Sequence, residues 1–300
     1  MTEPHDIGAS DVPAILGLSP WQTPAQAWAR LIGLDKRDSS SDATRRGHIL
    51  ERAILWDYAD RHGLDYEHRP TDLEHVKANG FQRLYQGPEY GSGHRDRHAE
   101  HAWATCRPDA YHVETIGFGA IVKRLVEVKT TRSWSDWESA DGKPILPPTY
   151  FVQVQWQMLV TGVEETIVEA FNVFDDSRRA VTVAYKPKIG AQLLAKVSAW
   201  RERHLVAGEL PEEGVTADIA GLIWPAEREP AVWLDPTDEA RELCAAYADG
   251  LDAEKAGKAA KEAARDRLCV LIADASGFDG LCSWHVAKNG RRTFRLKGER

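Results

Sequence analysis

Residues 108–129 read PDAYHVETIGFGAIVKRLVEVK, and this stretch decides the fold. Its second half, Ile121 to Val128, is mostly apolar and rich in β-branched residues, which is typical of a strand inside a sheet. The turn Ile-Gly-Phe-Gly at 116–119 separates it from an extended first half, so the stretch predicts two adjacent antiparallel strands. Outward from here, helical and extended patterns mix along the chain. The sequence therefore predicts an α/β (α+β) core in which helices flank a central mixed β-sheet.

The two predicted strands bring charged side chains together. Because residues i and i+2 of a strand point to the same face, Glu127 and Lys129 project together. Antiparallel pairing across the turn would place Asp109 alongside Glu127. Two carboxylates and a main-chain carbonyl make a hard oxygen site suited to Mg²⁺, with Mn²⁺ as a substitute. The ammonium of Lys129 can orient an attacking water, help to deprotonate it, and counter charge on a phosphate.

A surface ion pair on an edge strand is the competing interpretation, and the Glu-x-Lys pattern alone favours it. Two features favour a site instead. The strand from Ile121 to Val128 is too apolar for an edge. Glu51 also lies beside Leu50 and Ile54 on a helix that should pack on the sheet, where an unpaired acid is costly. A third carboxylate there could bind a second ion or gate the first.

The other elements follow from periodicity and end signals. A short helix is expected from Ser10, its predicted N-cap, to about Leu16, with Gly17 as the stop. A second helix is expected to be capped by Thr23 with Pro24 at its first position. Further helices are predicted near 44–62, 149–160 and 188–207, and further strands near 66–73, 81–87, 165–173 and 180–185.

The predicted domains are a core at 1–208, a linker at 209–235, and a helical extension at 236–300 that ends in a β-hairpin around Asn289-Gly290. The net charge is −8, but residues 255–300 contain eleven Lys or Arg and five Asp or Glu. An acidic body with a basic tail suits a nucleic-acid enzyme, although a solvated helix face explains the tail equally well. The sequence has no membrane-spanning apolar run and no secretory signal at its start, so a cytoplasmic location is expected.

Five blocks then resemble, in order, the YqaJ-like viral recombinases, relatives of phage lambda exonuclease in the PD-(D/E)XK nuclease superfamily. They are IGASDVPAILGLSPWQTPAQAW, GHILERAI, ATCRPDA, LVEVKTT and YFVQVQWQMLVTG, and together they span about residues 7–162. The resemblance implies a restriction-endonuclease-like core. By the same likeness, the metal ligands are Asp109, Glu127, the Val128 carbonyl and Glu51, the catalytic lysine is Lys129, and Gln153 contacts the site.

The resemblance also assigns Ser10 to the terminal 5′-phosphate of the substrate. Relatives often carry an arginine a few residues before that serine, but the upstream sequence MTEPHDIG contains none. Arg107 could substitute for it, or Arg45 or Arg46 could reach in. A second departure is Ala110, which follows Asp109 where glycine is usual.

The activity implied by the resemblance is a Mg²⁺-dependent exonuclease that degrades linear double-stranded DNA from 5′ to 3′, producing single strands for homologous recombination. A single-strand annealing protein is the implied partner, and the lambda-type members form a ring-shaped trimer, so a homo-oligomer is an open alternative. A single-strand or repair nuclease is the second reading. Many such nucleases hold an iron–sulfur cluster, which the scattered cysteines argue against, so no cluster is expected. A non-catalytic DNA-end-binding protein is the third, although such proteins typically lose one of Asp109, Glu127 and Lys129.

Two further clusters receive plainer interpretations. His94, His98 and His101 lie in a polar, glycine-rich stretch that predicts a solvated loop rather than a metal site. The tryptophans Trp134, Trp137 and Trp156 are expected to pack in the core or a loop rather than to stack on a base.

Overall fold

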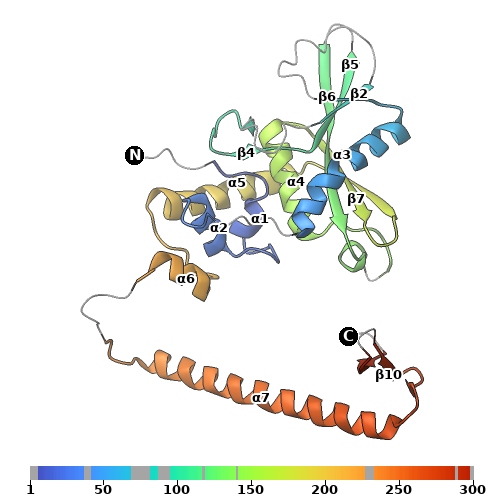
Figure 1. Cartoon of the computed structure of the whole chain (residues 1–300). Helices are drawn as coiled ribbons and strands as arrows, with labels where there is room; N and C mark the ends of the chain where they lie inside the picture. Colours follow the sequence, from blue (N-terminus) through green and yellow to red (C-terminus); the bar gives the residue numbers. More distant parts are fainter. Residues whose placement is uncertain are drawn as a thin grey trace. The chain divides into compact units, whose positions relative to one another are not determined.

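The computed structural model describes residues 6–36, 42–68, 82–86, 95–116, 119–139, 141–226, 233–287 and 290–297. The chain forms two compact units, Met1–Ala226 and Glu227–Arg300, which are described separately. Figure 1 labels their helices and strands. No helix in the described ranges is long and apolar enough to cross a membrane.

Unit 1 is built on a six-stranded sheet with the order β1-β2-β5-β6-β7-β8. Its strands are β1 (Asp65–His68), β2 (Gln82–Gln86), β5 (Ala110–Ile116), β6 (Gly119–Thr131), β7 (Glu165–Asn172) and β8 (Arg178–Ala184). The pairs β1–β2 and β6–β7 are parallel and the others are antiparallel, so the sheet is mixed as predicted. Strand β6 has a neighbour on each side, which confirms that the Glu-x-Lys pair does not lie on an edge strand.

Two helices pack on opposite faces of this sheet. Helix α3 (Asp42–His62) packs Leu55 and Tyr58 in one cluster with Val126 and Val128 of β6. Helix α4 (Pro148–Thr161) contributes Val154 and Met158 to the cluster on the other face, with Leu125 of β6. Because side chains alternate along a strand, Glu127 and Lys129 share the α4 face with Leu125.

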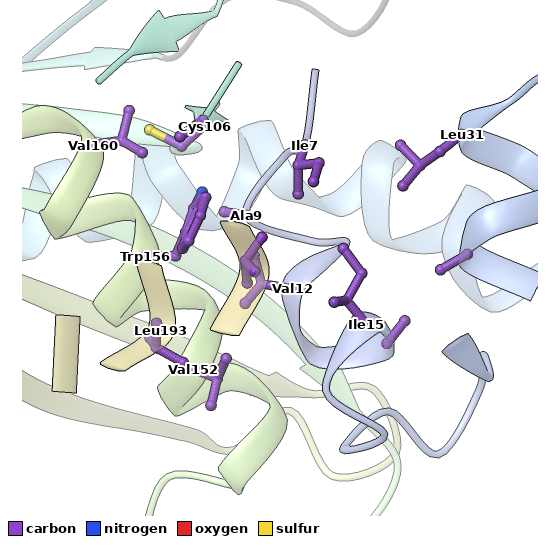
Figure 2. Close-up of a cluster of buried hydrophobic side chains, with 14 residues drawn as sticks. Ile7, Ala9, Val12, Ile15, Leu31, Cys106, Val152, Trp156, Val160 and Leu193 are labelled. Atoms are coloured by element: carbon purple, nitrogen blue, oxygen red, sulfur yellow. The ribbon is translucent and has the colours of Figure 1, made fainter. Parts of the chain in front are cut away.

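The N-terminal segment is anchored on the side of α4 away from the sheet. Figure 2 shows Ile7, Val12 and Ile15 in one buried cluster with Trp156 of α4 and Leu193 of α5. Helix α5 (Pro187–Arg201) continues as a π-helical turn, Glu202–Val206. Because Trp156 is fully buried, its ring belongs to the core, as predicted. The same holds for Trp137, which is 3% exposed.

Of the first two helices, the second begins at the predicted cap and the first does not. Helix α2 (Pro24–Leu31) begins with a complete capping box between Thr23 and Gln26, as the sequence predicted for Thr23. Helix α1 is shorter than expected, Val12–Ile15, and its N-cap is Asp11, so the prediction of Ser10 as N-cap is wrong. The Asp11 carboxylate accepts a hydrogen bond from the Gly8 amide at 2.8 Å and pairs with Arg30, which fixes a turn before the helix starts.

The segment expected to be a linker contains a packed helix. Helix α6 (Ala217–Ile223) buries Ile219 in a cluster with Ala25 and Trp28 of α2. The Thr23 hydroxyl also donates to the Gly214 carbonyl at 2.7 Å. These contacts place residues 209–226 in unit 1, which ends at Ala226.

Unit 2 consists of α7 (Asp238–Ile272) followed by the strands β9 (Gly277–Phe278), β10 (Cys282–Val286) and β11 (Arg292–Leu296). Strands β10 and β11 pair as an antiparallel hairpin, as predicted, although Asn289 of the expected turn lies outside the described residues. The Arg292 guanidinium donates to the carbonyls of Ala273 and Ala275 and stacks on Trp284, 3.8 Å from its ring centroid. Arg292 therefore ties the hairpin to the end of α7.

The remaining small elements of unit 1 lie between β2 and β5 and after β6. Strands β3 (Asp96–Arg97) and β4 (Thr105–Cys106) form a two-stranded ribbon, and a 3-10 turn spans Ser135–Trp137. In the turn between β3 and β4, the His98 Nδ1 atom accepts hydrogen bonds from the amides of Glu100 and His101. This imidazole organises a turn, while His94 lies outside the described residues.

Candidate functional site

The register between β5 and β6 places the acidic residues of the candidate site side by side. Ala110 pairs with Val126 at the end of this ladder, and continuing the register by one residue brings Asp109 level with Glu127. The Asp109 carboxylate accepts a hydrogen bond from the Val128 amide at 2.7 Å. This bond holds Asp109 against β6 beyond the last ladder pair, so the two acids lie together although eighteen residues separate them in sequence.

Glu127 is the most enclosed group of the site, with an exposed fraction of 2%. Its Oε1 atom accepts from the Lys129 ammonium and from the Gln153 amide, both at 2.5 Å. Its Oε2 atom accepts from the Gln157 amide at 2.7 Å. A buried carboxylate is costly unless donors compensate for the lost water, and three donors perform that task here.

Gln157 was missed in the sequence, although a signal for it exists. It lies four residues after Gln153 in QVQWQ, and residues at i and i+4 lie on the same helix face. The side chain is fully buried. The hydrogen bond from the Gln157 side-chain nitrogen goes to the Glu127 carboxylate, while the side-chain oxygen has no partner among the described residues. Gln157 therefore positions this carboxylate.

Lys129 lies between the carboxylates and the aromatic ring of Tyr150. Its ammonium lies 5.1 Å from the ring centroid of Tyr150 in α4. Burial alone would lower the pKa of Lys129, but the carboxylates of Glu127 and Asp109 outweigh burial and raise this pKa. The side chain is therefore held as an ammonium, the form that orients a water or counters charge on a phosphate.

An exposed tryptophan lies next to the ring of Tyr150. The Trp21 ring stacks near Tyr150 with centroids 6.0 Å apart, and its side chain is 69% exposed. Trp21 was not predicted as a site residue, because its position beside Tyr150 depends on the packing of the loop before α2 against α4. An exposed aromatic ring is the kind of surface on which a nucleobase stacks.

Glu51 adds a third carboxylate from α3. Its pKa is raised by burial first and by Glu127 second, while His48, Arg107 and Lys129 act to lower it. The pKa of Asp109 is raised well above its usual value by burial, then by Glu127 and Glu51. The three acids therefore share one electrostatic environment, and Arg107 is close enough to influence it.

These three carboxylates fit a divalent cation by their chemistry. Hard oxygen donors that repel one another in a buried place are stabilised by a cation such as Mg²⁺. As they stand, no three His, Cys, Asp or Glu side chains of the described residues are arranged to enclose an ion. The oxygens of Glu127 are instead occupied by Lys129, Gln153 and Gln157.

The residues expected at a terminal phosphate are distributed differently. Ser10 is exposed in the turn before α1. An ideal Cβ atom built on Gly8 would lie 3.0 Å from the Arg95 guanidinium and 3.9 Å from the Ser10 hydroxyl. The structure thus places Arg95 beside the Gly8–Ser10 turn, a residue that sequence reasoning did not consider alongside Arg107, Arg45 and Arg46. Arg45 and Arg46 lie in the first turns of α3.

The sequence model of the YqaJ-like viral recombinase domain matches residues 2–164. The chain belongs to this family. The match confirms the resemblance seen in the five sequence blocks. Unit 1 has the α/β core that was expected, with a central mixed sheet flanked by helices. Within the family, the chain is 27% identical over 161 residues to the uncharacterized protein YqaJ of Bacillus subtilis (strain 168). That alignment covers 53% of this chain, and the chain spans 40% of the length of this curated relative.

Solved structures of exonucleases resemble the chain more distantly. An alkaline exonuclease from Laribacter hongkongensis is 19% identical, with a TM-score of 0.46, over 67% of this chain and 90% of that one. A phage-related exonuclease from Haemophilus somnus 129PT is 12% identical, with a TM-score of 0.43, over 67% of this chain and 94% of that one. Likeness at this level does not establish a shared activity.

Proposed function

We propose that unit 1 is a Mg²⁺-dependent DNA exonuclease that degrades linear double-stranded DNA from 5′ ends and supplies single strands for homologous recombination. The observation that carries the proposal is the buried Glu127 carboxylate, held by three donors beside Asp109 and Lys129. Membership of the recombinase family supports the recombination role, and the likeness to exonucleases agrees with the chemistry of the site.

In this proposal Asp109, Glu127, Glu51 and the Val128 carbonyl would hold the metal, which polarises the phosphate and lowers the pKa of a water. Gln153 and Gln157 keep the Glu127 carboxylate in a fixed orientation. Lys129 offers its ammonium to the attacking water and to the charge that develops on the phosphate. The complete set of Asp109, Glu127 and Lys129 counts against a non-catalytic end-binding protein, because such proteins typically lose one of these groups.

Polarity depends on recognition of the 5′ end, for which Ser10 and Arg107 are the proposed contacts. Arg95 joins them, because its guanidinium lies beside Ser10 across Gly8. Serine hydroxyls and guanidinium groups are suitable donors for a terminal phosphate. A single-strand annealing protein as partner and a homo-oligomeric state remain parts of the proposal.

The test uses linear duplexes with 5′-phosphate, 5′-hydroxyl or blocked 5′ ends, incubated in Mg²⁺ with the wild type and with Lys129→Ala. The proposal predicts mononucleotide release from the 5′-phosphorylated strand by the wild type and none by the variant. Cleavage of closed circular DNA would identify an endonuclease, degradation of single strands alone would favour a repair nuclease, and tight end binding without hydrolysis would favour an end-binding protein.

A further inference from the structure

The exposed charges of helix α7 are mostly acidic in its first half and mostly basic in its second half. Of its 35 residues, Ile272 is the one whose side chain is buried. Residues 238–254 contain six acidic residues and one arginine, whereas residues 255–272 contain five basic and two acidic residues. The basic half begins near the middle of the helix and continues into the hairpin of the same unit.

Three cations of the basic half share one face of the helix. Lys258, Lys261 and Arg265 are spaced i, i+3 and i+7, which places them within about 60° of one another at 100° per residue. This group is called the basic stripe. All three side chains are exposed. Within the described residues, neither lysine has an ion-pair partner, and Arg265 pairs with its neighbour Asp266.

The helix dipole does not explain the basic stripe. Cations stabilise a helix mainly when they lie in its last turn, where the carbonyl groups are unpaired. The basic stripe lies seven to fourteen residues before the last helical residue, Ile272. Packing does not explain it either, because the stripe buries nothing within unit 2.

The hairpin extends the positive charge beyond the helix. Arg292 fixes the hairpin to the end of α7 through the carbonyls of Ala273 and Ala275. Arg295 and Lys297, both exposed, are carried on or directly after β11. The anchor therefore keeps these cations on the same unit as the stripe.

We propose that the basic stripe, together with the cations of the hairpin, binds the phosphate backbone of duplex DNA without regard to sequence. This inference deepens the proposed function and rests on it, since DNA is the polyanion that unit 1 would hydrolyse. Lysines and arginines on an exposed face bind DNA largely by releasing counterions, which requires no pocket and no base contact. A binding element on unit 2 would retain the duplex between hydrolytic steps.

A second copy of the chain fits this face less well. Association through two helices needs apolar residues that repeat along the shared face. The exposed apolar side chains Leu243, Tyr247 and Leu251 repeat at i, i+4 and i+8 in the acidic half of α7 and end seven residues before Lys258, while Val270 and Leu271 lie in its last turn. Over residues 258–265, the same face carries the three cations of the stripe in place of apolar residues. Charge complementarity therefore favours a polyanion.

The experiment measures the affinity of the full-length protein for a 5′-phosphorylated duplex by fluorescence anisotropy in EDTA, between 50 and 200 mM salt. The stripe variant is Lys258→Gln, Lys261→Gln and Arg265→Gln together. The matched control is Lys196→Gln, Arg241→Gln and Arg267→Gln, which removes the same charge from exposed helix positions outside the stripe. Glutamine has nearly the helix propensity of lysine and arginine, so circular dichroism should show equal helix content in all three proteins.

Three phosphate contacts add about 2.7 to the slope of log affinity against log salt. The wild type should therefore lose roughly 40-fold more affinity than the stripe variant over this fourfold salt range, whereas the control should follow the wild type. Equal slopes in the wild type and the stripe variant, or equal losses in both variants, would overturn the proposal. A change of oligomeric state in the stripe variant, measured by light scattering without a change of slope, would assign the face to a second copy.

Failure of this inference can be told apart from failure of the proposed function. Binding is measured without metal, so it does not depend on hydrolysis. In a parallel assay with Mg²⁺, low salt and saturating DNA, the stripe variant should hydrolyse the duplex at the wild-type rate. Hydrolysis with unchanged salt dependence would refute the stripe alone, while absent hydrolysis by the wild type would refute the proposed function alone.

Discussion

Replacing Gln157 by methionine tests how far the position of Glu127 depends on its helix donors. Methionine has nearly the shape of glutamine but cannot donate a hydrogen bond. The change removes the Gln157 bond to the Glu127 Oε2 atom while the donors to Oε1 remain. It also removes a buried Oε1 atom that has no partner among the described residues.

The two losses have opposite effects on stability. Leaving the buried, charged Glu127 Oε2 atom without its donor costs at least about 1–3 kcal/mol, while removal of the unpaired Gln157 Oε1 atom recovers about 1–3 kcal/mol. The free energy of unfolding should therefore fall only by the difference between these two terms. The metal affinity should fall by about 10–100-fold, because the group that orients a metal ligand typically contributes that much.

Gln155 provides the matched control. It is equally buried on α4, but its amide donates to the Ala184 carbonyl and accepts from the Lys186 amide, away from Glu127. Gln155→Met should lower the free energy of unfolding by about 1–3 kcal/mol for each backbone group left unpaired, and it should leave metal affinity unchanged.

The assays are titration calorimetry with Mn²⁺ or Mg²⁺ and denaturant unfolding of both variants. The expected outcome is a double dissociation, with weaker metal binding in Gln157→Met and lower stability in Gln155→Met. Wild-type metal affinity in Gln157→Met, or an equal loss of affinity in Gln155→Met, would refute the positioning role of Gln157.

Three further predictions concern other parts of the chain. Burial, followed by the charge of Arg124, lowers the pKa of His112 below its usual 6.5. Below about pH 6.5 the unfolded chain therefore binds a proton that the folded chain excludes, so the free energy of unfolding falls as the pH drops. His112→Gln should flatten this loss in unfolding curves recorded between pH 7.5 and 5, and an unchanged slope would contradict the assignment. Gly277→Ala should disrupt the pairing of β9 with β10 in unit 2, because the added Cβ atom would lie 2.2 Å from the Cys282 carbonyl oxygen at a residue whose φ is +145°. Unchanged hydrogen-exchange protection of β10 would count against this expectation. Trp21→Ala should weaken binding of single-stranded DNA ends by about 1–3 kcal/mol with unchanged stability, as measured by anisotropy, and equal binding would exclude stacking on this ring.

The parts of the fold that the sequence predicted well depend on local information. Strands β5 and β6 are joined by a short turn, so their antiparallel pairing follows from the chain itself, whereas the register shift between His112 and Val113 that brings Asp109 level with Glu127 does not. The Thr23 cap and the helix ends also follow from neighbouring residues. These contacts need no knowledge of how distant segments pack.

The features that were missed arise from packing between distant segments. Arg95 reaches the Gly8–Ser10 turn because the ribbon after β2 lies against the N-terminal segment, a contact that no local pattern encodes. Helix α6 lies in a segment with linker-like composition, and the single buried side chain of Ile219 secures it. Gln157 was accessible from its spacing to Gln153, but an amide on a mostly apolar helix resembles an ordinary core residue.

The most direct test of the central claim compares Lys129→Ala with Glu127→Ala in one experiment that records both metal affinity and release of mononucleotides from a linear 5′-phosphorylated duplex. Lys129 supplies an ammonium and Glu127 supplies a ligand, so both variants should lose hydrolysis. The Lys129 variant should still bind the metal, whereas the Glu127 variant should not. Equal metal affinity in the two variants, or hydrolysis that survives either substitution, would contradict the account.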